Sequence, residues 1–201
     1  MPEAVIVATA RTPIGRAFKG SLKDVRPDDL AVTAVRAALD KVPQLDPHDI
    51  DDLMLGCGLP GGASGFNMGR VVSVLLGYDF LPGTTVTRYC SSSLQTTRMA
   101  LHAIRSGEGD VFISAGVESV SSFVLGNSDS LPDTENPVFS EAKARTVARA
   151  EAGAPAWTDP REDGAVPDIY IAMGQTAENL AQIKGITRRD QDEFGVRSQN
   201  L

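Results

Sequence analysis

Residues 84–115, TTVTRYCSSSLQTTRMALHAIRSGEGDVFISA, contain a helical segment between two runs rich in β-branched and apolar residues. Residues 84–89 and 110–115 predict strands, and residues 91–106 predict a helix that ends at Gly107. The apolar face expected for this helix consists of Leu94, Thr97, Leu101 and Ile104. A strand, a helix and a second strand in close succession are typical of an α/β fold with a parallel sheet.

The same alternation continues toward the N-terminus. Residues 4–10 (AVIVATA) form a short apolar run, which predicts a buried strand. A helix is expected to open at Pro27, a second short strand at 53–55 and another helix at 67–76. Because strands and helices alternate at short spacing, we predict an α/β, layered fold whose mostly parallel sheet is covered by helices on both faces.

The alternation stops after the fourth expected strand. Residues 121 to about 165 are polar and contain several prolines and glycines, which predicts an irregular, functional or inserted segment. Two helices are expected at 171–184 and 188–200, the second capped by Thr187. The last helix has no stop signal before Leu201, so we expect the chain to be part of a longer protein.

Composition limits the functional classes. The 201 residues are 42% hydrophobic and 22% charged, with a net charge of −7. A nucleic-acid-binding protein usually carries a basic surplus, so we expect no nucleic acid partner. No apolar run has the length of a membrane helix, and no signal peptide precedes the first strand. Two cysteines do not make a disulfide framework, which favours a reducing, cytoplasmic setting.

Cys90 is the candidate nucleophile. It stands between a predicted strand and a predicted helix and is followed by Ser91, Ser92 and Ser93. The free N–H groups of a first helical turn stabilise a thiolate, and they can also hold an oxyanion on a bound carbonyl. Such a cysteine suits acyl transfer through a covalent intermediate. Position alone leaves open the alternative that Cys90 is a small buried apolar residue.

No partner base is evident in the sequence. His102 follows Cys90 on the same helix, roughly 18 Å along its axis at about 1.5 Å per residue, which is too far. His48 lies in a helix-capping segment and is expected to be a solvated loop residue. Glu118 is either a catalytic carboxylate or a charged residue at the end of a strand. Cys57 is expected to be a structural thiol, and we predict no metal site.

Residues 56–61 (GCGLPG) match the glycine spacing of a dinucleotide-binding motif after a strand. Pro60 and the glycines that follow it prevent a helix from opening directly out of this motif. We therefore reject a nucleotide-binding function for it.

Five segments resemble the thiolase family, in the family's order along the chain. They are Arg11-Thr12-Pro13-Ile14-Gly15, Cys90-Ser91-Ser92-Ser93-Leu94-Gln95, Ala115-Gly116-Val117-Glu118-Ser119-Val120-Ser121, Ala172-Met173-Gly174-Gln175-Thr176-Ala177-Glu178-Asn179, and the stretch from Asp190 to Gln199. Three positions differ from the residues common in the family: Ser93 replaces glycine, Ala172 replaces histidine and Val120 replaces methionine.

The resemblance implies a CoA-dependent acyltransferase of the acetyl-CoA C-acetyltransferase type, active in fatty acid metabolism. The thiolate of Cys90 attacks the 3-keto carbon of a 3-ketoacyl-CoA, acetyl-CoA leaves, and a second CoA takes the acyl group; the reverse is a Claisen condensation. No metal or cofactor is implied beyond CoA as substrate. Ser91 and Met173 are implied to contact substrate. Thiolases are homodimers or homotetramers, and the strand from Thr84 to Arg88 is implied to lie in the subunit contact.

The resemblance also divides the chain. Residues 1–120 correspond to the N-terminal α/β domain without its final strand, and residues 121–201 to the start of an inserted loop domain. Family subunits are about twice as long, and their second half supplies an activating histidine and a second cysteine. We expect the present chain alone to be inactive. Two alternatives remain open: a 3-ketoacyl synthase-like condensing enzyme, and a non-catalytic CoA-binding subunit that keeps the fold.

Overall fold

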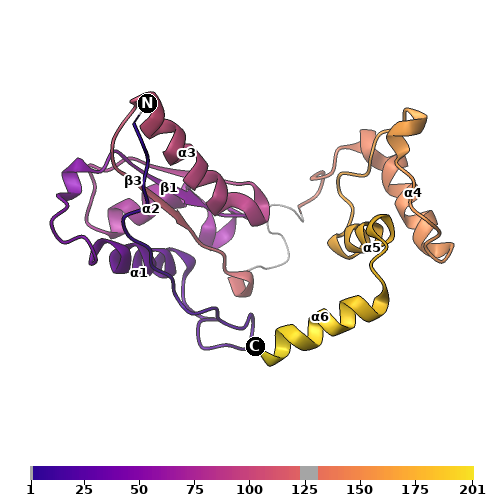
Figure 1. The fold of residues 1–201 in the computed structure, drawn as a ribbon. Helices are drawn as coiled ribbons and strands as arrows, with labels where there is room; N and C mark the ends of the chain where they lie inside the picture. The colour runs from indigo at the N-terminus through magenta and orange to yellow at the C-terminus, as the bar shows by residue number, and fades with distance from the viewer. Residues whose placement is uncertain (1, 123–130) are drawn as a thin grey trace. The chain divides into compact units, whose positions relative to one another are not determined.

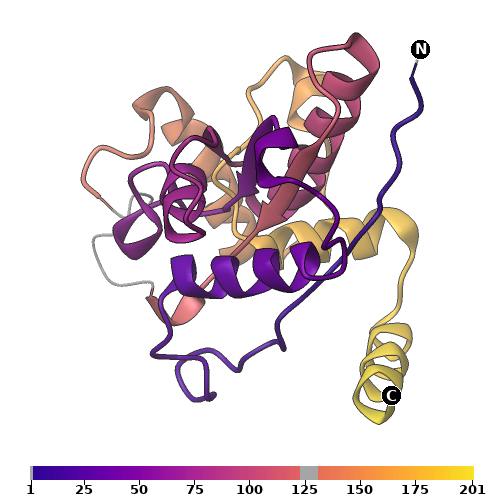
Figure 2. The ribbon, with the colours of Figure 1, turned by 90° about the vertical axis from the view of Figure 1, so that its left-hand side faces the viewer.

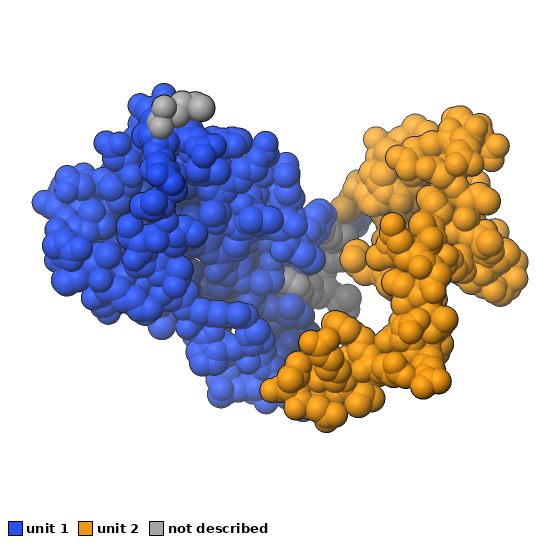
Figure 3. All heavy atoms as spheres, in the orientation of Figure 1, with its two compact units in different colours: residues 1–132 blue, residues 133–201 orange. Residues whose placement is uncertain are grey.

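The computed structural model describes residues 2–122 and 131–201, which form two compact units. Unit 1 comprises residues 1–132 and unit 2 residues 133–201, and Figure 3 colours them separately. The domain boundary predicted at residue 120 precedes this division, and the assignment of the two domains remains a prediction. Within the described ranges, no helix is long and apolar enough to cross a membrane.

Unit 1 is built on a three-stranded parallel sheet (Figure 1). Its strands are β1 (Asp52–Gly56), β2 (Gly83–Val86) and β3 (Phe112–Gly116), in the order β2-β1-β3. Gly56 lies opposite Val86 on one side and Gly116 on the other, so all three strands end at the same edge. The α/β class and the parallel sheet predicted from the sequence are therefore confirmed.

Helices cover both faces of this sheet. α1 (Pro27–Leu39) and α2 (Met68–Leu75) pack on the face toward which Leu53 and Leu55 point, whereas α3 (Ser92–Ser106) packs on the face of Gly56. Figures 1 and 2 show α1 and α3 on opposite sides of the strands. The core between α1, α2 and β1 comprises Ala31, Val35, Ile50, Leu53, Leu55, Cys57, Met68, Val72, Leu76 and Leu81.

The apolar face predicted for α3 is wrong. Leu94 is 71% exposed, whereas the buried positions of the helix are Ser92, Thr96, Ala100 and Ala103. These side chains are small because the helix approaches the sheet closely over glycine. A methyl group at Gly56 would lie 2.5 Å from the backbone nitrogen of Ser93, nearer than real Cβ atoms come.

The strand predicted at residues 4–10 is also not formed. The structure assigns no strand there, and Val5, Ile6 and Val7 are each more than two-thirds exposed. Lys41 Nζ donates a hydrogen bond of 2.6 Å to the carbonyl of Thr9. β-Branched content shows that a segment suits a pleated surface, but it does not supply a pairing partner. Both sides of β1 are already occupied by β2 and β3.

Unit 2 is helical. It contains α4 (Ser140–Glu151), α5 (Met173–Lys184) and α6 (Arg188–Asn200), and the capping box of Thr187 with Asp190 opens α6 as predicted. α4 corrects the expectation of an irregular segment from 121 to about 165, of which residues 123–130 lie outside the described part. Its sequence, SEAKARTVARAE, is rich in strong helix formers, so propensity was the signal that the prolines and glycines around it obscured.

Candidate functional site

A cavity of about 560 Å³ opens at the edge where the three strands end. Its walls include Gly56 at the end of β1 and Gly58 just after it, Cys90 before α3, Gly116 at the end of β3 and Glu118 just after it. The carboxyl edge of a parallel sheet is where α/β proteins usually place their ligand sites. The sequence motifs at 56–61, 90–95 and 115–121 therefore meet at one place.

Cys90 lies at the start of a helix, as the sequence predicted. It is the central residue of a single 3-10 turn, Tyr89–Ser91, which continues directly into α3. The residue is exposed and lines the cavity. Cys90 is thus not a buried apolar residue, and its sulfur can be reached by a ligand in the cavity.

The turn that carries Cys90 is held by a buried serine. Ser92 Oγ accepts a hydrogen bond of 2.8 Å from the Arg88 nitrogen and donates one of 2.6 Å to the Tyr89 carbonyl. Between these two contacts, Tyr89 adopts a positive φ of 44°, which costs a non-glycine residue conformational energy. Backbone strain of this kind clusters at functional sites, and here it turns the chain sharply just before the cysteine.

Glycines at two strand ends let this turn approach the sheet. Gly56 lies against the backbone of Ser92 and Ser93, and Gly116 lies directly against the Ser93 side chain. A side chain at Gly56 would meet backbone atoms and push the start of α3 away from the strands, whereas one at Gly116 would first displace the Ser93 hydroxyl. Gly56 therefore determines how closely the start of α3 approaches the sheet beside the cavity.

Cys57 and Glu118 form a second polar contact beside the cavity. Cys57 is 1% exposed, and its Sγ donates a hydrogen bond of 3.8 Å to Glu118 Oε1. Burial, together with the negative charge of Glu118, raises the pKa of the Cys57 thiol above its ordinary value of 9.0. Cys57 is therefore a protonated structural thiol, as expected from its position at a strand end.

Replacing Cys57 by serine is expected to flatten the alkaline loss of stability. Because the folded thiol has the higher pKa, its contribution is complete below about pH 9 and is lost as the pH rises through the folded pKa. Between the pKa of the unfolded thiol and the pKa of the folded thiol, the unfolding free energy of the unaltered chain falls more steeply with pH than that of Cys57→Ser. The difference in slope is up to about 1.4 kcal/mol per pH unit. Urea titrations from pH 7 to pH 11 would measure the slope, and equal slopes for the two chains would contradict the burial argument.

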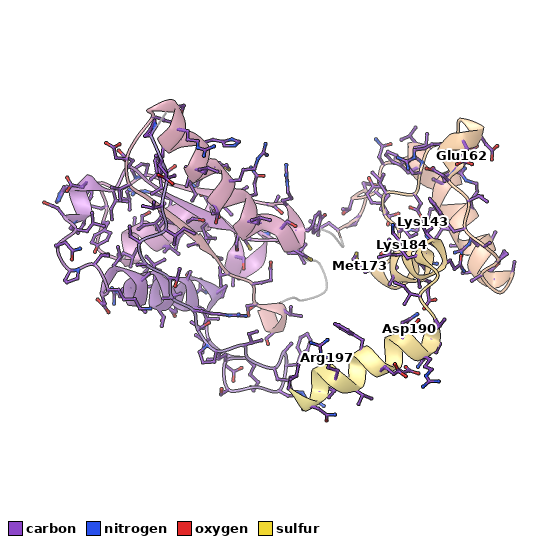
Figure 4. All side chains as sticks on the ribbon, in the orientation of Figure 1. Lys143, Glu162, Met173, Lys184, Asp190 and Arg197 are labelled. Atoms are coloured by element: carbon purple, nitrogen blue, oxygen red, sulfur yellow. The ribbon has the colours of Figure 1, made fainter. Side chains whose placement is uncertain are left out.

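The other predicted residues lie as follows. Ser91 is exposed in the turn beside Cys90, and Met173 is 77% exposed at the start of α5 in unit 2 (Figure 4). Their substrate contacts remain predictions. His48 is an exposed residue whose backbone N–H is capped by Asp46; its ring Nδ1 lies 3.1 Å from Asp46 Oδ1, and the ring is stacked on Phe80. The sequence left open whether Glu118 is a catalytic carboxylate or a charged residue at a strand end. The one signal that it belongs to the site was its place just after a predicted parallel strand.

Comparisons with known proteins agree with this geometry. The family model described as "Thiolase, N-terminal domain" matches residues 4–201. The 3-ketoacyl-CoA thiolase of Bacillus subtilis (strain 168) is 39% identical over 199 residues, covering 98% of this chain and 44% of that protein. The 3-oxoadipyl-CoA/3-oxo-5,6-dehydrosuberyl-CoA thiolase of Escherichia coli (strain K12) is 37% identical over 202 residues, covering 99% of this chain and 47% of that protein.

A solved structure shares the fold. The crystal structure of the Bacillus anthracis acetyl-CoA acetyltransferase superposes with a TM-score of 0.70 at 29% sequence identity, covering 98% of this chain and 46% of that one. The chain thus spans slightly less than half the length of the relatives it matches.

Proposed function

The chain belongs to the thiolase family, and on this premise we propose that Cys90 is the nucleophile of a CoA-dependent acyltransferase. The observation that carries the proposal is the position of Cys90: exposed, at the first turn before α3, on the wall of the cavity at the strand ends. The free N–H groups of a first helical turn can hold the oxyanion of a tetrahedral intermediate.

In the degradative direction the sulfur of Cys90 forms a bond to the 3-keto carbon of a 3-ketoacyl-CoA. The bond between that carbon and the neighbouring CH₂ group breaks, and acetyl-CoA leaves after its carbanion takes up a proton. A second CoA thiol then removes the acyl group from Cys90. No histidine is found among the described residues that line the cavity. We propose that the activating base comes from the half of the relatives that this chain does not cover.

Substrate and partner contacts complete the proposal. CoA serves as substrate without a metal or a further cofactor, and Ser91 and Met173 contact the acyl-CoA. Residues 1–120 act as the α/β domain and residues 121–201 as the start of the inserted loop domain, in a cytoplasmic homodimer or homotetramer. The segment from Thr84 to Arg88 supports this assembly, because β2 is an edge strand whose outer backbone groups can pair with another chain.

Acetyl-CoA is expected to acetylate Cys90 in the full-length protein. The exposed thiol at the helix start is positioned for attack, whereas Cys57 is buried and protonated. Mass spectrometry of peptides after brief exposure to acetyl-CoA would find the adduct on the Cys90 peptide and none on the Cys57 peptide. The matched control is Cys90→Ser, which removes the thiol at nearly constant size.

Two outcomes would redirect the proposal. CoA binding without an adduct on Cys90 would support the alternative of a non-catalytic CoA-binding subunit. A faster adduct from a carrier-protein thioester than from acetyl-CoA would support the 3-ketoacyl synthase alternative.

A further inference from the structure

The carboxylate of Glu118 holds the loop that follows β1. Its Oε2 accepts a hydrogen bond of 2.7 Å from the Gly58 nitrogen, and its Oε1 accepts the longer one from the Cys57 thiol. Glu118 itself follows β3, the strand that pairs with β1. One side chain therefore connects the exits of two neighbouring strands.

Gly58 also contacts the residues just before Cys90. Its carbonyl accepts a hydrogen bond of 2.9 Å from Thr87 Oγ1. A methyl group added at its Cα would be in ordinary van der Waals contact with the turn, 3.4 Å from the carbonyl carbon and oxygen of Tyr89. The same methyl group would come within 2.6 Å of Glu118 Oε2. Gly58 is thus held between the Glu118 carboxylate and the residues that immediately precede Cys90.

The strain at Tyr89 makes this support necessary. A non-glycine residue at positive φ persists only where its surroundings fix it. Ser92 holds the turn from the helix side through Arg88 and Tyr89. Gly58 is bound to Thr87, two residues before Tyr89, through the hydrogen bond from Thr87 Oγ1, and Glu118 fixes Gly58 by accepting the hydrogen bond of its N–H.

We infer that Glu118 is a positioning residue for Cys90, which acts through Gly58 by accepting a hydrogen bond and transfers no proton. This inference rests on the proposed function in so far as Cys90 is the nucleophile. The role requires an acceptor oxygen and not a charge, because the group that Glu118 holds is a neutral backbone N–H. A glutamine, whose amide oxygen is also an acceptor, should fulfil it.

The test compares Glu118→Gln with Glu118→Ala in the full-length protein, with Glu151→Ala on α4 as a surface control. The first readout is the rate of Cys90 acetylation by acetyl-CoA. We expect Glu118→Ala to slow acetylation by about 10- to 100-fold, since small displacements of a reacting group have effects of that size. The acetylation rate of Glu118→Gln should stay within about threefold of the rate of the unaltered protein. Equal losses in the two variants would show an acid or base role and overturn the inference. An unchanged rate of Cys90 acetylation in Glu118→Ala would also overturn the inference. Glu118 would then stabilise the fold without positioning the cysteine.

The second readout does not depend on acyl transfer. Hydrogen exchange of the peptide that covers residues 87–93 should accelerate in Glu118→Ala and stay unchanged in Glu118→Gln. Absent acetylation of the unaltered protein would refute the proposed function, and the exchange pattern would then decide the positioning role by itself. Unchanged exchange in Glu118→Ala would refute the positioning role while leaving the proposed function intact.

Discussion

A Gly56→Ala variant is expected to lose about 100-fold in the rate of Cys90 acetylation and to be about 1–3 kcal/mol less stable. The added methyl group would lie 2.5 Å from the Ser93 nitrogen and 2.6 Å from the Ser92 carbonyl carbon. Both atoms belong to the backbone, so no flexible side chain can move aside. The start of α3 must shift, and with it Ser92, the two hydrogen bonds that it makes and the cysteine that precedes it.

Two measurements separate the effects on the site and on the fold. Urea titrations measure the free energy of unfolding. The acetylation rate, measured under conditions where the variant is fully folded, shows whether the thiol of Cys90 has been displaced. The matched control is Gly195→Ala in α6, where the same methyl group meets nothing within 4 Å and alanine favours the helix. A Gly56→Ala protein that reacts at the unaltered rate would show that the turn does not depend on its distance from β1.

The strands and helices of unit 1 from α1 to β3 could be predicted because local pattern and tertiary structure agree there. Pro27 opens α1, Gly107 closes α3 in a left-handed conformation, and the β-branched run before Cys90 supplies β2. The location of Cys90 at a helix start follows from the same pattern. Three motifs, each weak by itself, meet at one cavity because the carboxyl ends of parallel strands share an edge.

What could not be predicted depends on contacts between distant segments. Residues 4–10 have the composition of a strand, but whether they pair is decided by which strands flank β1. The link from Glu118 to Gly58 joins residues 60 positions apart, and no local pattern indicates it. The buried face of α3 was misjudged for a related reason: hydrophobic periodicity selects the large residues, whereas a helix packed over glycine buries its small ones.

Replacing Leu55 by alanine is expected to destabilise unit 1 by about 2–5 kcal/mol, the usual cost of truncating a buried leucine. Leu55 is fully buried in the central strand and belongs to the core shared with α1 and α2. The strand is fixed by β2 and β3 on its two sides, so its backbone cannot collapse into the space that the lost atoms leave. Since a small domain is stable by only about 5–15 kcal/mol, a large part of its stability depends on this side chain.

The matched control, Leu94→Ala, makes the same chemical change on the helix whose apolar face was predicted wrongly. Leu94 loses little burial on truncation because most of its surface is already exposed, so the expected change in unfolding free energy is within about 0.5 kcal/mol. Urea unfolding of both variants gives the two changes in free energy, provided that the free energy depends on urea concentration with the same slope in each variant. Similar losses would mean that Leu94 packs against the sheet, which would require α3 to rotate about its axis. That rotation would carry Ser92 out of the contact that holds the turn of Cys90, so this comparison of stabilities also tests the geometry of the site.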